Sequence, residues 1–234
     1  MTLIQSLSSF WNKPLGNGGC RFREIICNDD IKIILNKAIL SKKPAHILLV
    51  GKPGSAKTMF LTEIMSHIKE SYFIVGSNTS KAGLVNQLFE RRPKFLLIDE
   101  LDKMGKYDQV SLLHLMETGI ISETKIKKTR QTELTSWVFA TSNDCQRIIE
   151  PLLSRFLILN IPEYTLGEFI HISVCRLEKE QVNTSLAIEI AKTVWKELGS
   201  RDVRDVIKVA RLATNMEDIS NIVRIMKHHP CRES

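Results

Sequence analysis

Short apolar runs alternate with helix-like segments along the first two thirds of the chain. The apolar runs lack the polar alternation of a strand with one face in water, which indicates strands that are buried on both faces. Strands are predicted at His46–Val50, Tyr72–Val75, Phe95–Asp99, Trp137–Thr141 and Leu157–Ile161, and helices at Ser55–Glu70, Ser80–Glu90 and Gln109–Met116. Strands that are separated by helices are typical of a parallel sheet. The pattern therefore predicts an α/β fold, an αβα sandwich around a five-stranded parallel sheet.

After Pro162 the hydrophobic periodicity is only helical. Thr165 and Glu168 have the spacing of a capping box, in which two side chains satisfy free backbone N–H groups at a helix start. Helical apolar faces follow, one with Ala187, Ala191, Val194, Trp195 and Leu198 and another with Val203, Val206, Ile207 and Ala210. We expect about four helices in this part. The chain is therefore predicted to form two domains, residues 1–163 and residues 164–234.

The composition excludes several classes of protein. Of the 234 residues, 43% are hydrophobic and 25% are charged, unlike a disordered or fibrous chain. The apolar runs are far shorter than the roughly 20 residues that span a bilayer, so we expect neither a signal peptide nor a membrane contact.

Five scattered cysteines without a Cys-x-x-Cys pair indicate a cytoplasmic protein without a disulfide framework or zinc site. Histidines such as His46 and His114 are expected in packed or solvent-edge positions. The net charge of +7 is compatible with polyanionic partners.

A loop directly after the first predicted strand matches the P-loop pattern in all but one position. It consists of Gly51, Lys52, Pro53, Gly54, Ser55, Ala56, Lys57 and Thr58. Backbone N–H groups in such a loop cradle phosphates together with the helix N-terminus. Lys57 would reach the β- and γ-phosphates of a nucleotide, and the Thr58 hydroxyl would bind Mg²⁺. The pattern has glycine where this chain has Ala56. Alanine can adopt helical backbone angles, so it is acceptable here if this residue already begins the helix. The alternative for the octapeptide alone is an ordinary glycine-rich turn.

The third predicted strand ends in two acids, Asp99 and Glu100. In an open α/β sheet, ligands lie beyond the carboxyl ends of the strands, so these acids belong on the same edge as the loop. Asp99 would hold Mg²⁺ directly or through water, and Glu100 would act as general base on the attacking water. Taken alone, a strand that ends in Asp-Glu is also compatible with a plain solvated strand end.

The fourth predicted strand ends at Asn143, which follows Asp99 by 44 residues. Its amide could orient the attacking water or the γ-phosphate from the neighbouring strand. Arg155 lies twelve residues later, at the end of a short helix before the last strand. An arginine there can point into a neighbouring subunit's nucleotide, where such a finger contributes about 10³–10⁵ in rate. The alternative for Arg155 alone is a surface salt bridge.

These elements occur in the order of the AAA+ ATPases, which the chain resembles over about residues 20–215. The resemblance implies a P-loop NTPase fold with a helical lid, binding of ATP and Mg²⁺, Asn143 as sensor 1 and Arg155 as the finger. It also implies a second sensor arginine at the start of a lid helix. We favour Arg204 for this role and keep Arg201 as the alternative. Ile25 and Ile26 would contact adenine.

Two segments resemble particular groups of this family. Pro44–Gly51 is similar to the stretch before the P-loop in the RuvB-like branch-migration motors. Leu115–Lys125 is similar to the segment before sensor 1 in those motors, in minichromosome maintenance helicases and in MoxR-type ATPases. The branch-migration motors carry a winged-helix DNA-binding domain after the lid. Because the sequence ends at Ser234, we expect that domain to be absent.

A basic hairpin is predicted within Ile120–Trp137, with β-forming residues between its cations. The cations are Lys125, Lys127, Lys128 and Arg130. In ring-shaped relatives such hairpins face the central pore, where basic side chains would contact DNA phosphates without reading sequence. The alternative is a solvated surface hairpin.

The sequence as a whole predicts a Mg²⁺-dependent ATPase that hydrolyses ATP to ADP and phosphate. We expect self-association into a ring, with a hexamer as the expected form, and coupling to remodelling or moving a DNA-associated substrate. Two alternatives remain open. One is a MoxR-like protein-remodelling chaperone ATPase, and the other is a nucleotide-gated binding module with negligible turnover.

Overall fold

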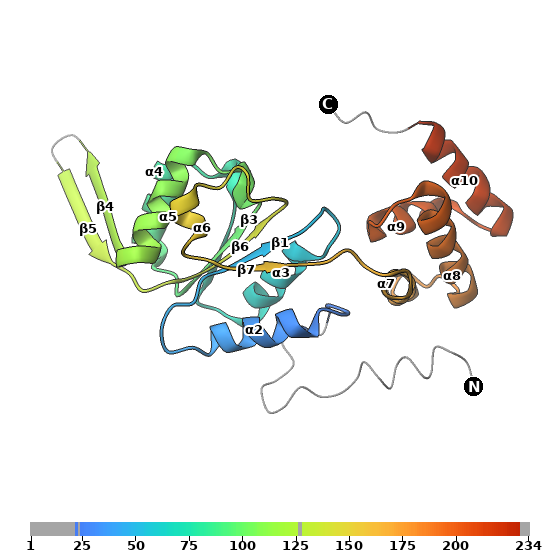
Figure 1. Cartoon of the computed structure of the whole chain (residues 1–234), viewed down its shortest axis with the longest axis horizontal. Helices are drawn as coiled ribbons and strands as arrows, with labels where there is room; N and C mark the ends of the chain where they lie inside the picture. The colour runs from blue at the N-terminus through green and yellow to red at the C-terminus, as the bar shows by residue number, and fades with distance from the viewer. Residues whose placement is uncertain (1–21, 23, 126–127, 230–234) are drawn as a thin grey trace. The chain divides into compact units, whose positions relative to one another are not determined.

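The computed structural model describes residue 22, residues 24–125 and residues 128–229 (Figure 1). The chain folds into two compact units. The first unit contains the described residues up to 51 together with residues 56–161, and the second contains residues 52–55 together with the described residues from 162 onward. Each unit has its own hydrophobic core.

A five-stranded parallel sheet forms the centre of the first unit, as the sequence predicts. Its strands are β1 (Ile47–Val50), β2 (Ser71–Val75), β3 (Phe95–Asp99), β6 (Trp137–Ser142) and β7 (Leu157–Asn160), in the spatial order β2-β3-β6-β1-β7. Ile47 of β1 lies opposite Phe139 of β6 on one side and Leu157 of β7 on the other. The strand that precedes the phosphate loop is therefore paired on both edges, which gives the loop a rigid base.

Helices cover both faces of this sheet (Figure 1). They are α2 (Asp29–Ile39), α3 (Lys57–His67), α4 (Lys81–Arg91), α5 (Lys106–Thr118) and α6 (Glu150–Leu153), with short 3₁₀ turns at Gly76–Asn78 (η1) and Leu101–Lys103 (η2). Successive strand residues point to opposite faces. Leu48 and Val50 accordingly join the core under α4 and α5, whereas Ile47 and Leu49 join the core under α2 and α3. This arrangement explains why every position of β1 is apolar.

Helix α2 is not among the elements predicted from the sequence. Its signal is the helical spacing of four buried side chains, Ile31, Leu35, Ala38 and Ile39. Helix α3 is shorter than predicted, because the backbone of Ala56 is left-handed and that of Ile68 is extended. Helix α5 is longer than predicted and ends at Gly119, whose φ of 70° terminates the helix.

The predicted hairpin forms a separate two-stranded antiparallel sheet of β4 (Ile120–Lys125) and β5 (Lys128–Glu133). Ile121 and Leu134 at its base are buried in the core beside α5. The base of the hairpin is thus part of the first unit.

The second unit is helical (Figure 1). Its elements are α7 (Leu166–Glu178), α8 (Thr184–Thr193), the π-helix η3 (Val194–Leu198), α9 (Val203–Leu212) and α10 (Met216–His228). The capping box at the start of α7 is confirmed, since Thr165 accepts from Glu168 N and Glu168 accepts from Thr165 N. Phe169 and Trp195 pack with a centroid distance of 5.2 Å in the core of this unit. No helix among the described residues has the length and apolar composition needed to cross a membrane.

Candidate nucleotide site

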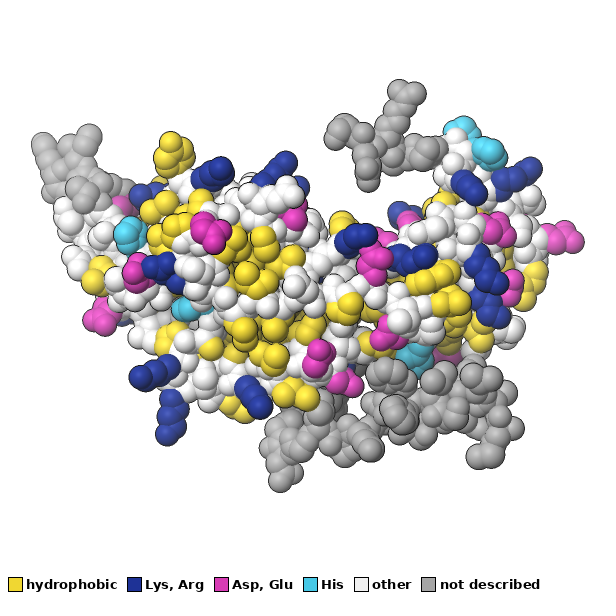
Figure 2. Space-filling model, in the orientation of Figure 1, with side chains coloured by type: hydrophobic (Ala, Val, Ile, Leu, Met, Phe, Trp, Pro, Cys, Tyr) yellow, Lys and Arg dark blue, Asp and Glu magenta, His cyan; other side chains and the backbone are white. Residues whose placement is uncertain are grey.

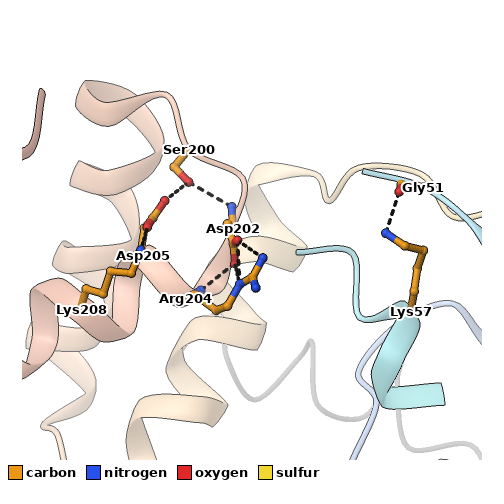
Figure 3. Close-up of polar contacts among 7 residues, drawn as sticks. All are labelled: Gly51, Lys57, Ser200, Asp202, Arg204, Asp205 and Lys208. Atoms are coloured by element: carbon orange, nitrogen blue, oxygen red, sulfur yellow. Dashed lines mark hydrogen bonds and ion pairs between the residues drawn. The ribbon is translucent and has the colours of Figure 1, made fainter. Parts of the chain in front are cut away.

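The loop between β1 and α3 turns sharply and is held to its neighbours by backbone and side-chain hydrogen bonds. The Gly51 N–H donates to the Ser142 carbonyl at 3.2 Å, which ties the loop to the end of β6. Gly54 has a φ of +84°, a conformation that glycine adopts readily. Lys57 is buried, and its Nζ donates to the Gly51 carbonyl at 2.6 Å (Figure 3). The ammonium group therefore lies at the start of the loop, next to the N-terminus of α3.

Ala56 departs from its expected conformation. It precedes the first residue of α3 with φ 62° and ψ 13°, in the left-handed region. The condition under which alanine fits here, that it already begins the helix with helical angles, is not met, because the chain turns at Ala56 before it enters the helix. An L-residue in this region costs roughly 1–2 kcal/mol, whereas glycine has no such penalty.

Three polar side chains converge where β3 and β6 end. Thr58 Oγ1, in the first turn of α3, donates to Asp99 Oδ2 at 2.9 Å. Thr141 Oγ1, on β6, donates to Asp99 Oδ1 at 2.5 Å and accepts from the Glu100 N–H at 3.0 Å. Hydroxyl and carboxylate oxygens are the ligands that Mg²⁺ prefers. The chemistry of Thr58 and Asp99 therefore fits the metal that the sequence implies.

Thr141 is not among the site residues expected from the sequence. It is fully buried and links Asp99 to the backbone of Glu100. The signal for it is a polar residue at the carboxyl end of an otherwise apolar strand, Trp137–Ser142. A buried hydroxyl needs a hydrogen-bond partner, and here that partner is Asp99 at the end of the neighbouring strand β3.

Glu100 and Asn143 follow two neighbouring strands at the same edge of the sheet. Glu100 is half-buried with a left-handed backbone (φ 54°, ψ 52°) between β3 and η2. A Cβ atom on Gly76 would lie 2.3 Å from the Glu100 carbonyl oxygen, so only glycine permits this approach. Asn143 is half-buried directly after β6, which pairs with β3. The fold thus brings the predicted base and the predicted sensor to one end of the sheet.

Arg155 is bound within its own unit. Its Nη2 lies 2.8 Å from Glu117 Oε2 at the end of α5. Its Nη1 donates to the Pro151 carbonyl in α6 at 2.5 Å. The side chain is therefore held against the C-terminal end of α5 and the backbone of α6.

The two candidate sensor arginines have different surroundings within the helical unit. The Arg201 guanidinium lies 3.4 Å from the centroid of the Trp195 ring, a cation–π contact. Arg204 Nη2 lies 2.6 Å from Asp202 Oδ2 at the start of α9. Burial raises the pKa of the Asp202 carboxyl, but hydrogen bonds from Arg204 outweigh this effect and hold that pKa below its ordinary value.

Asp202 also belongs to a local network that sets the start of α9 (Figure 3). It accepts from the Arg204 N–H at 2.9 Å as the N-cap of the helix. Ser200 Oγ accepts from the Asp202 N–H at 3.1 Å and donates to Asp205 at 2.6 Å. Lys208 then pairs with Asp205 at 2.8 Å. Arg204 is thus preceded by a rigid turn.

The expected adenine contacts differ in exposure. Ile25 is buried in the core beside α2 and α3, and Ile26 is half-exposed. Ile26 therefore has the more accessible side chain of the two.

Among the hairpin cations, Arg130 has a structural setting that the sequence did not indicate. Its Nε donates to Glu123 at 2.7 Å across the hairpin, and its Nη2 donates to Asn86 of α4 at 2.7 Å. The guanidinium also lies 4.2 Å from the centroid of the Phe89 ring. Arg130 consequently attaches the hairpin to α4. Lys127 and the side chains of Lys125 and Lys128 lie outside the described parts.

Comparison with known families places this chain among the AAA+ proteins. Residues 47–163 match the model of the family described as "ATPase family associated with various cellular activities (AAA)". This match covers the sheet, the phosphate loop, Asp99, Glu100, Asn143 and Arg155. The chain belongs to the AAA family.

Individual relatives give a finer picture. The DNA replication licensing factor mcm2 of Schizosaccharomyces pombe is 29% identical over 151 residues, which cover 52% of this chain and 18% of that protein. The minichromosome maintenance protein MCM of Saccharolobus solfataricus is 23% identical over 194 residues, 71% of this chain and 27% of that protein. This chain spans less than a third of the length of these curated relatives.

The fold is similar to that of a solved branch-migration protein. A structure of the RuvB Holliday junction branch migration motor of Thermotoga maritima aligns with a TM-score of 0.66 at 19% identity. The alignment covers 86% of this chain and 70% of that one. A mutant of the same protein aligns with a TM-score of 0.68 at 20% identity, over 88% of this chain and 72% of that one. The similarity confirms the P-loop fold with a helical C-terminal region.

Proposed function

We propose that this protein is a Mg²⁺-dependent ATPase that hydrolyses ATP to ADP and phosphate. The observation that carries the proposal is the direct contact between the Thr58 hydroxyl and the Asp99 carboxylate at 2.9 Å, beside the N-terminus of α3. These two groups would hold Mg²⁺. Lys57 and backbone N–H groups at the N-terminus of α3 would bind the phosphates.

The remaining chemistry belongs to the ends of β3 and β6. Glu100 would accept a proton from the attacking water, and Asn143 would orient that water. Thr141 would hold the Asp99 carboxylate and the Glu100 backbone in fixed positions relative to each other. Bound Mg²⁺ would neutralise charge on the β- and γ-phosphates. The oxygen of water then bonds to the γ-phosphorus as the bond to the ADP oxygen breaks.

Arginine side chains would complete the nucleotide site. Arg155 would leave Glu117 and reach the nucleotide of the adjacent subunit in a ring, expected to be a hexamer. Arg204, with Arg201 as the alternative, would sense the nucleotide from the lid. In this proposal residues 1–163 form the nucleotide-binding domain and residues 164–234 form the lid.

We further propose that turnover remodels or moves a DNA-associated substrate in the manner of RuvB-like proteins, in the cytoplasm. The similarity to a replication licensing factor and to a branch-migration motor supports this substrate class. Lys125, Lys127 and Lys128 would contact DNA, while Arg130 supports their hairpin from α4.

The Glu100→Gln variant tests the proposal. Loss of the general base should lower steady-state ATP hydrolysis by about 10²-fold or more, with ATP binding retained. Glu90→Gln, at an exposed position of α4, is the matched control and should hydrolyse ATP like the parent protein. Unchanged hydrolysis in Glu100→Gln would contradict the assignment, as would negligible hydrolysis by the parent protein.

A further inference from the structure

The helical unit contains a groove between η3 and α10. It is lined by Lys196, Glu197, Ser220, Asn221, Val223, Arg224, Lys227 and His228. Figure 2 shows Lys, Arg and His side chains gathered on the surface around the end of α10. Ser220, Arg224 and Lys227 follow one another at helical spacing, so they share one face of α10.

The cations of this groove differ from the cations of α9. Arg204, Lys208 and Arg211 each pair with a carboxylate within 3.2 Å. For Lys196 and Lys227, by contrast, the described residues provide no carboxylate within salt-bridge distance. Arg224 likewise has only a contact of 3.5 Å to Asn221 Oδ1 within the described residues. Glu197 is the one acid that lines the groove within the described part of the chain.

Helix electrostatics do not account for this arrangement. Cations in the last turn of a helix offset its dipole, which explains Lys227 and His228. Lys196 has the same position in the last turn of η3. The dipole does not explain Arg224, which lies one turn earlier in α10, nor does it explain why cations of two different helices line one groove. Cations from η3 and α10 therefore line the same groove without carboxylate partners among the residues that the structure describes, and Glu197 is the one acid beside them.

We propose that this groove binds the sugar–phosphate backbone of duplex DNA. Amines, guanidinium groups, hydroxyls and amides are the side-chain donors that contact phosphate oxygens, and all four kinds line the groove. Phe, Tyr and Trp are absent from its lining among the described residues, which favours contacts with the phosphate backbone over stacking on single-stranded bases. Its apolar lining residue, Val223, is fully buried and cannot anchor an acidic amphipathic helix. The choice of DNA among polyanions rests on the proposed function.

The test measures binding of the full chain to a labelled duplex of mixed sequence by fluorescence anisotropy between about 50 and 200 mM salt. A variant that combines Arg224→Ala and Lys227→Ala should bind more weakly. Its plot of log affinity against log salt should be less steep by about 2, because each lost phosphate contact removes about 0.9 from the slope. Lys196→Ala, on the opposite wall, should lower the slope by about 1.

Arg176→Ala is the matched control, because Arg176 is an exposed cation of α7 that does not line the groove. It should keep the parent slope, and circular dichroism should show an unchanged fold for every variant. If the groove variants show the same slope of log affinity against log salt as the parent protein, the inference is overturned. Absence of DNA binding by the parent protein at about 50 mM salt overturns it as well. Equal displacement of DNA by polyglutamate at matched charge would also overturn it, in favour of an acidic-peptide site. ATP hydrolysis is measured separately, so failure here leaves the proposed catalytic function standing.

Discussion

Ala56 shows how one residue in the phosphate loop affects stability. Its backbone is left-handed at a position where the P-loop pattern has glycine. Ala56→Gly should remove a conformational cost of roughly 1–2 kcal/mol, and the greater freedom of the unfolded glycine chain should offset part of this gain. We expect a net gain of about 0.5–1 kcal/mol in the free energy of unfolding, measured by urea denaturation.

The same substitution at a right-handed position provides the control for Ala56. Ala82 is exposed in the first turn of α4, and Ala82→Gly should destabilise the protein by up to about 1 kcal/mol. A loss of stability in both variants would show that the left-handed conformation of Ala56 carries no strain.

At the scale of elements, His46 connects three strands. It lies directly before β1, its Nδ1 accepts from the Val138 N–H of β6 at 3.1 Å, and its carbonyl accepts from the Leu157 N–H of β7 at 2.8 Å. Burial lowers the pKa of His46 below its ordinary value of 6.5, although a hydrogen bond to the Met116 backbone works in the opposite direction. The neutral ring is therefore the form that fits between the strands.

This setting predicts a pH-dependent stability. Below about pH 6.5, His46 binds a proton more readily in the unfolded chain than in the folded chain. The free energy of unfolding should therefore fall as pH decreases. His46→Asn keeps an acceptor near the same place and should show a smaller decrease between about pH 7.5 and 5.5. Urea midpoints at the two pH values measure the effect. His114→Asn, at an exposed position of α5, should retain the parent pH dependence, and an unchanged dependence in His46→Asn would refute the role of His46.

For the whole molecule, the proposed ring makes Arg155 act on a neighbouring subunit. Arg155→Ala and Glu100→Gln should each hydrolyse ATP far more slowly than the parent protein when alone. Their equal mixture should regain up to about a quarter of the parent turnover, because an Arg155→Ala subunit keeps its own base and receives Arg155 from a Glu100→Gln neighbour. Steady-state hydrolysis at several mixing ratios measures this recovery. Arg91→Ala, which removes an exposed arginine that contacts Tyr72, should by itself hydrolyse ATP at the parent rate. Absence of any recovery on mixing would contradict action of Arg155 on a neighbouring subunit.

Much of this molecule follows from local sequence. Uniformly apolar strands between helices predict a sheet covered on both faces, and the parallel sheet places the loop, Asp99 and Asn143 at one edge. The capping box at Thr165 is equally local, because it requires only residues three apart. These features depend on the backbone period and on short-range hydrogen bonds, which neighbouring residues determine.

Other features depend on which distant residues pack together. Thr141 finds Asp99 because β6 pairs with β3, Arg130 is held by α4, and Arg155 is held by Glu117. The basic groove exists because η3 and α10 fold side by side in the helical unit. Residue order and hydrophobic period were thus enough to predict the class of fold and to place the candidate site residues at one edge of the sheet. The partner of each side chain followed only from the folded molecule, because packing between elements far apart along the chain selects it.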